Sequence, residues 1–136
     1  MVNEPFRRNE FERQARANLE RSRREPSGAE AEWWRLYESA TIEGHEREAR
    51  SCLLQLSLLL SSQLRHREAL RAALRANRLA ATRESLIHLA QSLVRHGWLR
   101  FARQIFRAAL RVPDASSHSE ERYRFALAAL KKLERR

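Results

Sequence analysis

The segment that decides the fold is Thr82–Ser116, which reads TRESLIHLAQSLVRHGWLRFARQIFRAALRVPDAS. Apolar residues recur in it every three or four positions, the spacing of a helix that buries one face. Thr82 is placed to cap a first helix, and Gly97 is placed to end it in a left-handed turn. A second helix begins at Trp98 and is stopped by Pro113. The segment therefore predicts a hairpin of two antiparallel helices.

Helix-capping and helix-breaking residues divide the rest of the chain in the same way. A break at residues 25–28 separates an Arg/Glu-rich N-terminal helix, residues 1–25, from a helical domain, residues 26–136, within a single compact domain overall. Two capping boxes are expected, at Ser27 with Glu30 and at Ser117 with Glu120. The expected helices cover residues 5–24, 28–43, 45–63, 66–80, 83–96, 98–112 and 118–134. The predicted fold class is all-α, with about seven helices arranged as antiparallel hairpins.

Composition supports this fold class and excludes several others. The 136 residues are 43% hydrophobic but include only three Gly and three Pro, which favours helices around a core over a Gly-rich phosphate loop or a sheet-based enzyme. Cys52 is the only cysteine, so an internal disulfide is impossible and a buried structural thiol is expected. The 27 Lys and Arg outnumber the 17 Asp and Glu, giving a net charge of +10. Such a charge favours a polyanionic or acidic partner.

Catalytic and targeting signals are lacking in the sequence. Glu84 and His88 alone have a metal-compatible i, i+4 spacing, and no second carboxylate or zinc-protease motif accompanies them. We therefore expect no enzyme activity, no catalytic residues, no cofactor and no metal. The N-terminus does not resemble a signal peptide, and the apolar stretch at residues 52–64 is too short to span a bilayer. A cytoplasmic protein without a membrane span is expected.

Two stretches of the chain superpose at an offset of 33 residues, a period typical of helix–turn–helix solenoids. Small residues match small residues, as in Ala69 with Ala102 and Ala76 with Ala109. Large residues match large ones, as in Leu53 with Leu86, Leu56 with Leu89 and Leu60 with Leu93.

Residues 83–116 resemble one tetratricopeptide repeat (TPR), and residues 50–82 resemble a second, weaker one that has Ala73 at a bulky position and no turn glycine. The matching positions are Leu86, Leu89, Ala90, Leu93, Gly97, Leu99, Ala102, Phe106, Ala109 and Leu110. Pro113 lies one place before the usual terminal proline. The resemblance implies a superhelical stack with the last helix as a cap; a nonrepetitive helical bundle is the alternative. Small residues at Ala90 and Ala102 allow close helix approach in either arrangement.

In this family the first helix of each repeat lines a concave groove. The resemblance therefore implies a partner-binding groove that is apolar and suited to an amphipathic helix or apolar peptide. Its expected residues are Leu54, Leu58, Ile87, Gln91, Val94, Tyr123 and Leu127. The Lys/Asn/Arg carboxylate clamp of chaperone-binding TPR domains is missing. The alternative is that the N-terminal helices fill the groove.

Arginines form two rows at helical spacing, which are candidates for polyanion binding. They are Arg67, Arg71, Arg75 and Arg78 on one helix and Arg100, Arg103, Arg107 and Arg111 on another. In a stacked array the two rows merge into one cationic face; the alternative is a solvated surface. Trp33 and Trp34 point about 100° apart on a helix, so we expect one to be buried and the other to lie at a second interface.

These features lead to three functional hypotheses. The first is a TPR-like adaptor or scaffold that holds an apolar helix of another protein within a larger complex or oligomer. The second is a small basic subunit of an RNA- or DNA-containing assembly, which contacts phosphates through arginine. The third is a TPR-type secretion or assembly chaperone.

Overall fold

The computed structural model describes residues 4–135, with side chains from residue 8 onward. All regular secondary structure in this range is helical, which confirms the predicted all-α fold class. The seven helices are α1 (Glu4–Arg24), α2 (Pro26–Ile42), α3 (Glu46–Ser62), α4 (His66–Leu79), α5 (Arg83–Arg95), α6 (Leu99–Arg111) and α7 (Ser119–Glu134).

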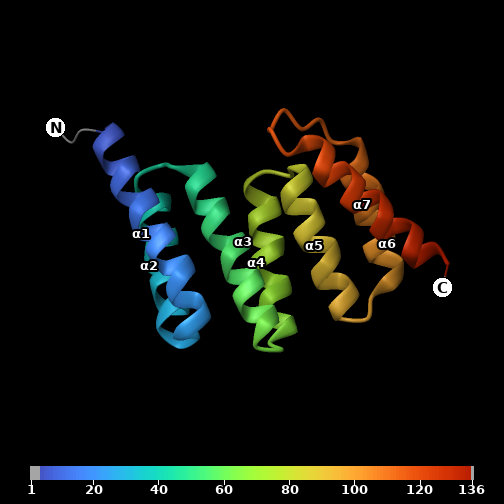
Figure 1. Cartoon of the computed structure of the whole chain (residues 1–136), viewed down its shortest axis with the longest axis horizontal. Coiled ribbons are helices and arrows are strands. Elements are labelled where there is room, and N and C mark those ends of the chain that lie inside the picture. Colours follow the sequence, from blue (N-terminus) through green and yellow to red (C-terminus); the bar gives the residue numbers. More distant parts are fainter. Residues whose placement is uncertain (1–3, 136) are drawn as a thin grey trace.

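The helices stack as a row of antiparallel hairpins from α1 at one end to α7 at the other (Figure 1). Each helix packs against the next in the chain, and among alternate helices α3 also contacts α5, and α5 contacts α7. These three helices therefore form one layer, which is the arrangement that a two-helix repeat produces.

Three of the helix connections are tight turns with nearly the same backbone. The residue in the left-handed region is Gly44 (φ 77°), Leu64 (φ 61°) or Gly97 (φ 87°). In each turn the following backbone N–H donates to the carbonyl five residues earlier, at 2.8–2.9 Å, which closes a Schellman motif. Leu64 and Gly97 are 33 residues apart, so the turn recurs with the period of the sequence.

Leu64 occupies this turn at a conformational cost. A left-handed backbone brings the β carbon of an L residue close to the carbonyl oxygen, costing about 1–2 kcal/mol, whereas glycine avoids this contact. The turn is kept because the helices on either side, α3 and α4, are packed tightly. Leu60 and Ala69, on either side of the turn, are both buried.

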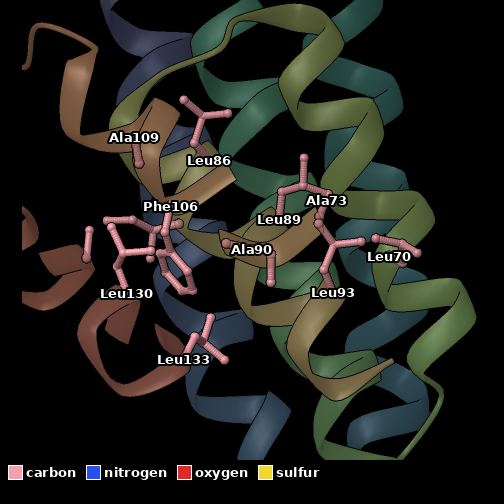
Figure 2. Packing of buried hydrophobic residues seen from close by; sticks show 13 residues of the cluster. Leu70, Ala73, Leu86, Leu89, Ala90, Leu93, Phe106, Ala109, Leu130 and Leu133 are labelled. Atoms are coloured by element: carbon pink, nitrogen blue, oxygen red, sulfur yellow. The ribbon is translucent and has the colours of Figure 1, made fainter. Parts of the chain in front are cut away.

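The larger core cluster joins α4, α5, α6 and α7 (Figure 2). The residues at which the repeat pattern places inter-helix contacts are all buried: Leu89, Ala90, Leu93, Ala102, Phe106 and Ala109. Ala90 and Ala102 have no exposed surface, so no larger side chain fits where α5 and α6 meet.

A second core cluster joins α2, α3 and α4, with α1 packed against it. Trp33 is buried in it, and its indole N–H donates to the Ser22 hydroxyl on α1 at 3.2 Å. Between the two clusters, the Ser57 hydroxyl on α3 donates to the Ala69 carbonyl on α4 at 3.0 Å. The polar side chains of the interior are therefore used to join neighbouring helices.

One of the expected helix caps is present and two are wrong. Thr82 caps α5 by accepting from the Ser85 N–H, and the Ser85 side chain accepts from the Thr82 N–H in return. Helix α2 instead begins at Pro26, so Ser27 lies inside the helix and does not cap it. Proline suits the first helical position because it has no backbone N–H that needs an acceptor there. Helix α7 begins at Ser119 after His118, one residue later than the box at Ser117 requires.

We expect Ala102→Arg to destabilise the protein by about 3 kcal/mol, because it forces a charged side chain into a fully buried helix contact. Gln104→Arg is the matched control, since Gln104 is exposed on the same helix. It should change the free energy of unfolding by less than about 0.5 kcal/mol. Thermal unfolding followed by circular dichroism measures both, and equal melting temperatures for the two variants would contradict the described packing of α5 on α6.

Candidate partner-binding groove and basic face

Two adjoining hollows lie between α5 and α7. The first has a volume of about 410 Å³ and is lined by Glu84, Ile87, His88, Gln91, His118, Glu121, Arg122 and Phe125. The second has a volume of about 240 Å³ and is lined by Gln91, Val94, Arg95, Phe106, Phe125, Ala129, Lys132 and Leu133. Because both include Gln91 and Phe125, they form one groove along the C-terminal half of the stack, which we call the α5–α7 groove.

The expected groove residues on α5 lie in this groove, whereas those on α7 do not. Ile87, Gln91 and Val94, which the resemblance implied as groove residues, line these hollows. On α7 the large exposed apolar residue that lines both hollows is Phe125, which is 47% exposed; the expected Tyr123 and Leu127 line neither hollow. The predicted register of α7 is therefore corrected.

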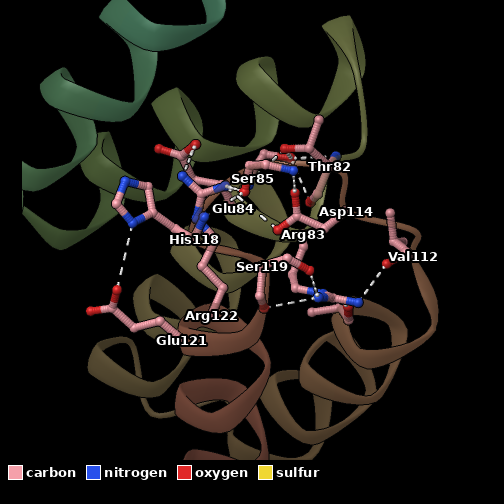
Figure 3. A network of polar contacts seen from close by, with 12 residues as sticks. Thr82, Arg83, Glu84, Ser85, Val112, Asp114, His118, Ser119, Glu121 and Arg122 are labelled. Atoms are coloured by element: carbon pink, nitrogen blue, oxygen red, sulfur yellow. Dashed lines mark hydrogen bonds and ion pairs between the residues drawn. The ribbon is translucent and has the colours of Figure 1, made fainter.

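Polar contacts surround the start of α7 (Figure 3), while Ala126, Leu130 and Leu133 of the same helix pack in the core. The Arg122 guanidinium lies 3.0 Å from a carboxylate oxygen of Glu84 on α5 and 3.6 Å from one of Asp114 in the preceding loop. Tyr123, the next residue, places its ring under the Arg83 guanidinium at 5.4 Å. Apolar residues occur on several faces of α7, so periodicity alone did not select the face that these contacts select.

Arg83 is the residue shaping the groove that sequence reasoning missed. Its side chain is only 8% exposed and donates to the carbonyls of Ala109 (3.1 Å) and Val112 (2.8 Å) at the end of α6. It also donates to the carbonyl and hydroxyl of Ser119, the first residue of α7. One buried guanidinium thus joins the start of α5 to the end of α6 and the start of α7, which fixes one end of the α5–α7 groove.

The position of Arg83 in the sequence could have indicated its role. Arg83 is the first residue of α5, where the positive end of the helix dipole disfavours a cation. An arginine at that position needs compensation from elsewhere, and the carbonyls at the end of α6 supply it.

The N-terminal half of the expected groove is largely occupied. Leu54 is buried in the core cluster of α2, α3 and α4, against which Phe11 and Ala15 of α1 pack. Leu58 is exposed on α3 but lines neither hollow of the α5–α7 groove. Next to α1 and α3 is a polar hollow, where Arg8 lies 3.7 Å from Glu48. The part of the expected groove that remains open within the described residues therefore lies between α5 and α7.

Polar groups surround one end of the α5–α7 groove. Burial lowers the pKa of His88, so the folded protein favours its neutral imidazole. A backbone hydrogen bond from Ser116 lowers the pKa of Asp114, which keeps this carboxylate ionised beside Arg122. The groove thus combines apolar side chains in its middle with hydrogen-bonding groups at its rim.

The eight arginines of the two rows fall into two groups. Arg75 lies over the rings of Trp34 and Tyr37 at 5.5 and 5.2 Å, and Arg107 lies 3.0 Å from a carboxylate oxygen of Glu134. The other six have no ion-pair partner within residues 8–135: Arg67, Arg71, Arg78, Arg100, Arg103 and Arg111. These six, of which only Arg103 is half-buried, are the arginines available to a polyanion.

Both adjacent tryptophans on α2 make contacts within the molecule. Trp33 is buried, and half-buried Trp34 packs its ring edge against Tyr37 with centroids 5.8 Å apart. The contact of Trp34 with Arg75 joins α2 to α4. The second interface expected for one tryptophan is therefore this contact with α4.

Within residues 4–135, no helix is long and apolar enough to cross a membrane. The same range contains no group of three or more His, Cys, Asp or Glu side chains placed to hold a metal ion. Cys52 is buried, and burial raises the pKa of its thiol to about 12, so it is protonated at neutral pH.

The fold and groove define an all-α stack of helical hairpins. No protein-family model, curated protein or solved structure matches the chain.

We expect Arg83→Met to lower the free energy of unfolding by about 3 kcal/mol, because it removes the donors that the Ala109 and Val112 carbonyls have at the end of α6. Arg78→Met is the matched control, since Arg78 is exposed and has no ion-pair partner in the described structure; it should change stability by less than about 0.5 kcal/mol. Urea unfolding measures both. Equal midpoints would show that the Arg83 contacts contribute nothing to folding.

Proposed function

We propose that this protein is a TPR-like adaptor that holds an apolar or amphipathic segment of another protein in the α5–α7 groove. The observation that supports this most is the pair of hollows that share Gln91 and the exposed ring of Phe125. Ile87 and Val94 supply further apolar surface on the opposite side. A bound side chain that buries against Phe125 gains apolar contact on two helices at once.

The rim of the groove supports specificity. Glu84, Glu121 and Arg122 surround the first hollow, and Arg95 and Lys132 lie at the second. Charged groups at a rim select the orientation of a partner, while the apolar centre provides most of the affinity. An adaptor needs no chemistry of its own, in keeping with the lack of a catalytic motif in the sequence.

We expect Phe125→Ser to reduce partner capture at least about tenfold while leaving the melting temperature nearly unchanged, because Phe125 is a half-exposed groove residue. Leu74→Ser is the matched control, since Leu74 is similarly exposed on α4 and outside the groove. The measurement is quantitative affinity purification of each variant from nuclease-treated lysate. A partner retained equally by both variants, or removed by nuclease, would contradict the proposed groove.

A second candidate function is nucleic-acid backbone binding. The six arginines without an ion-pair partner lie along α4 and α6, which both pack against α5. Guanidinium groups bind phosphate through paired hydrogen bonds, and the net charge of +10 attracts a polyanion from a distance.

We expect that replacing Arg67, Arg71, Arg100 and Arg103 together by Gln weakens binding to single-stranded RNA, if RNA is the ligand. For every phosphate that the variant no longer binds, the slope of log affinity against log salt should fall by about 0.7. Replacing Arg75 and Arg107 by Gln is the control, because these two already have partners in the fold. Fluorescence anisotropy over a salt series measures the slopes; an unchanged slope for the fourfold variant excludes these arginines from RNA binding.

A further inference from the structure

Two neighbouring turns on one edge of the stack, α3–α4 and α5–α6, expose large apolar side chains. Leu64, between α3 and α4, is 78% exposed. Trp98 and Phe101, at the turn from α5 to α6 and the start of α6, are 49% and 56% exposed, with ring centroids 6.2 Å apart. We call these three residues the turn-tip cluster.

The two turns lie close together on the same edge of the stack, the lower edge in Figure 1. Arg95, in the last turn of α5, reaches the Ser61 hydroxyl near the end of α3 at 3.4 Å. These two residues precede Trp98 and Leu64, respectively, by three positions. The apolar side chains of both turns therefore project from one edge of the protein.

Leu64 is costly to the fold in two ways. Its left-handed backbone (φ 61°) is strained for leucine, and its exposed side chain buries little surface in return. The equivalent turns use Gly44 and Gly97, which avoid both costs. Strain retained without gain in stability is typical of a residue that serves binding.

Basic residues predominate around the turn-tip cluster. Residues 63–67 and 95–101 contain four arginines and no Asp or Glu. Arg65 is engaged by Glu30 and Glu68, while Arg67 and Arg100 are exposed and have no ion-pair partner in the described structure. The apolar tips are thus flanked by guanidinium groups that are free to meet an anionic surface.

We propose that the turn-tip cluster binds an anionic lipid surface. Leu64, Trp98 and Phe101 enter the headgroup region, and Arg67 and Arg100 contact lipid phosphates and carboxylates. Tryptophan favours the membrane interface, and basic residues are attracted to anionic lipids. Leu64 favours lipid over nucleic acid as the occupant, because an aliphatic side chain cannot stack on bases as Trp98 and Phe101 can. Projecting tips also suit a continuous surface better than an apolar segment that needs a groove.

The decisive experiment is co-sedimentation of the full chain with vesicles of two parts phosphatidylcholine to one part phosphatidylserine, and with phosphatidylcholine alone. The wild type should bind the anionic vesicles preferentially and release as salt rises. Leu64→Gly should bind about tenfold more weakly, because one apolar insertion is removed. Its melting temperature should equal or exceed that of the wild type, since glycine relieves the strained turn, so weaker binding does not reflect unfolding.

Ile42→Ser is the matched control for the removal of apolar surface. Ile42 is 84% exposed on the opposite edge of the stack. The length of α3, about 25 Å, separates its turn from the turn that contains Leu64. Its replacement should leave vesicle binding unchanged. Arg67→Gln and Arg100→Gln should each weaken binding about fivefold.

The proposal is overturned if the wild type does not bind anionic vesicles, or if Leu64→Gly binds them as well as the wild type does. It is also overturned if oligouridine binds the protein and is weakened by Trp98→Ser while Leu64→Gly alters no binding, because the cluster is then a base-stacking platform. Phe125→Ser should leave vesicle binding intact, so failure of the lipid site and failure of the partner groove are distinguishable.

Discussion

Fully buried alanines are the constraint on which the rest of this structure depends. Eight alanines, drawn from α2, α4, α5, α6 and α7, have no exposed surface: Ala29, Ala69, Ala73, Ala76, Ala90, Ala102, Ala109 and Ala126. Their small side chains let helix backbones approach closely, and leucine and Phe106 fill the spaces on either side. A stack built this way presents one layer of helices, α3, α5 and α7, along which a groove can form.

Arg83 fixes the helices that form one end of the α5–α7 groove. The packing of Ala126, Leu130 and Leu133 in the core cluster sets which face of α7 is buried. The guanidinium of Arg83 holds the start of α7 in this orientation by binding carbonyls at the end of α6 together with Ser119, and Arg122 adds ion pairs to Glu84 and Asp114. Phe125 consequently lines the α5–α7 groove, and Tyr123 contacts Arg83 instead.

The exposed apolar residues lie in two separate regions of the surface, and part of the basic residues are used within the fold. Phe125 lies in the groove between α5 and α7, whereas Leu64, Trp98 and Phe101 project from turns on one edge of the stack. The arginines of α4 and α6 are partly used inside the molecule, because Arg75 packs on Trp34 and Arg107 pairs with Glu134. A partner segment and a lipid surface are therefore expected to meet different apolar residues. A polyanion would share Arg67 and Arg100 with the lipid surface, and Leu64 is the residue that separates these two kinds of binding.

The sequence by itself determined the helices, their turns and the core of the best repeat. These features depend on local spacing: apolar residues every three or four positions, Thr82 as a cap, Gly97 in the left-handed turn, and a period of 33 residues. Only the tertiary structure decided the rotation of α7, the burial of Arg83 and Leu54, and which arginines remain without partners. Each of these depends on contacts between residues distant in the chain, such as Arg83 with Ser119 or Arg75 with Tyr37. Helical periodicity shows which side chains share a face, but only packing against a neighbour shows what that face meets.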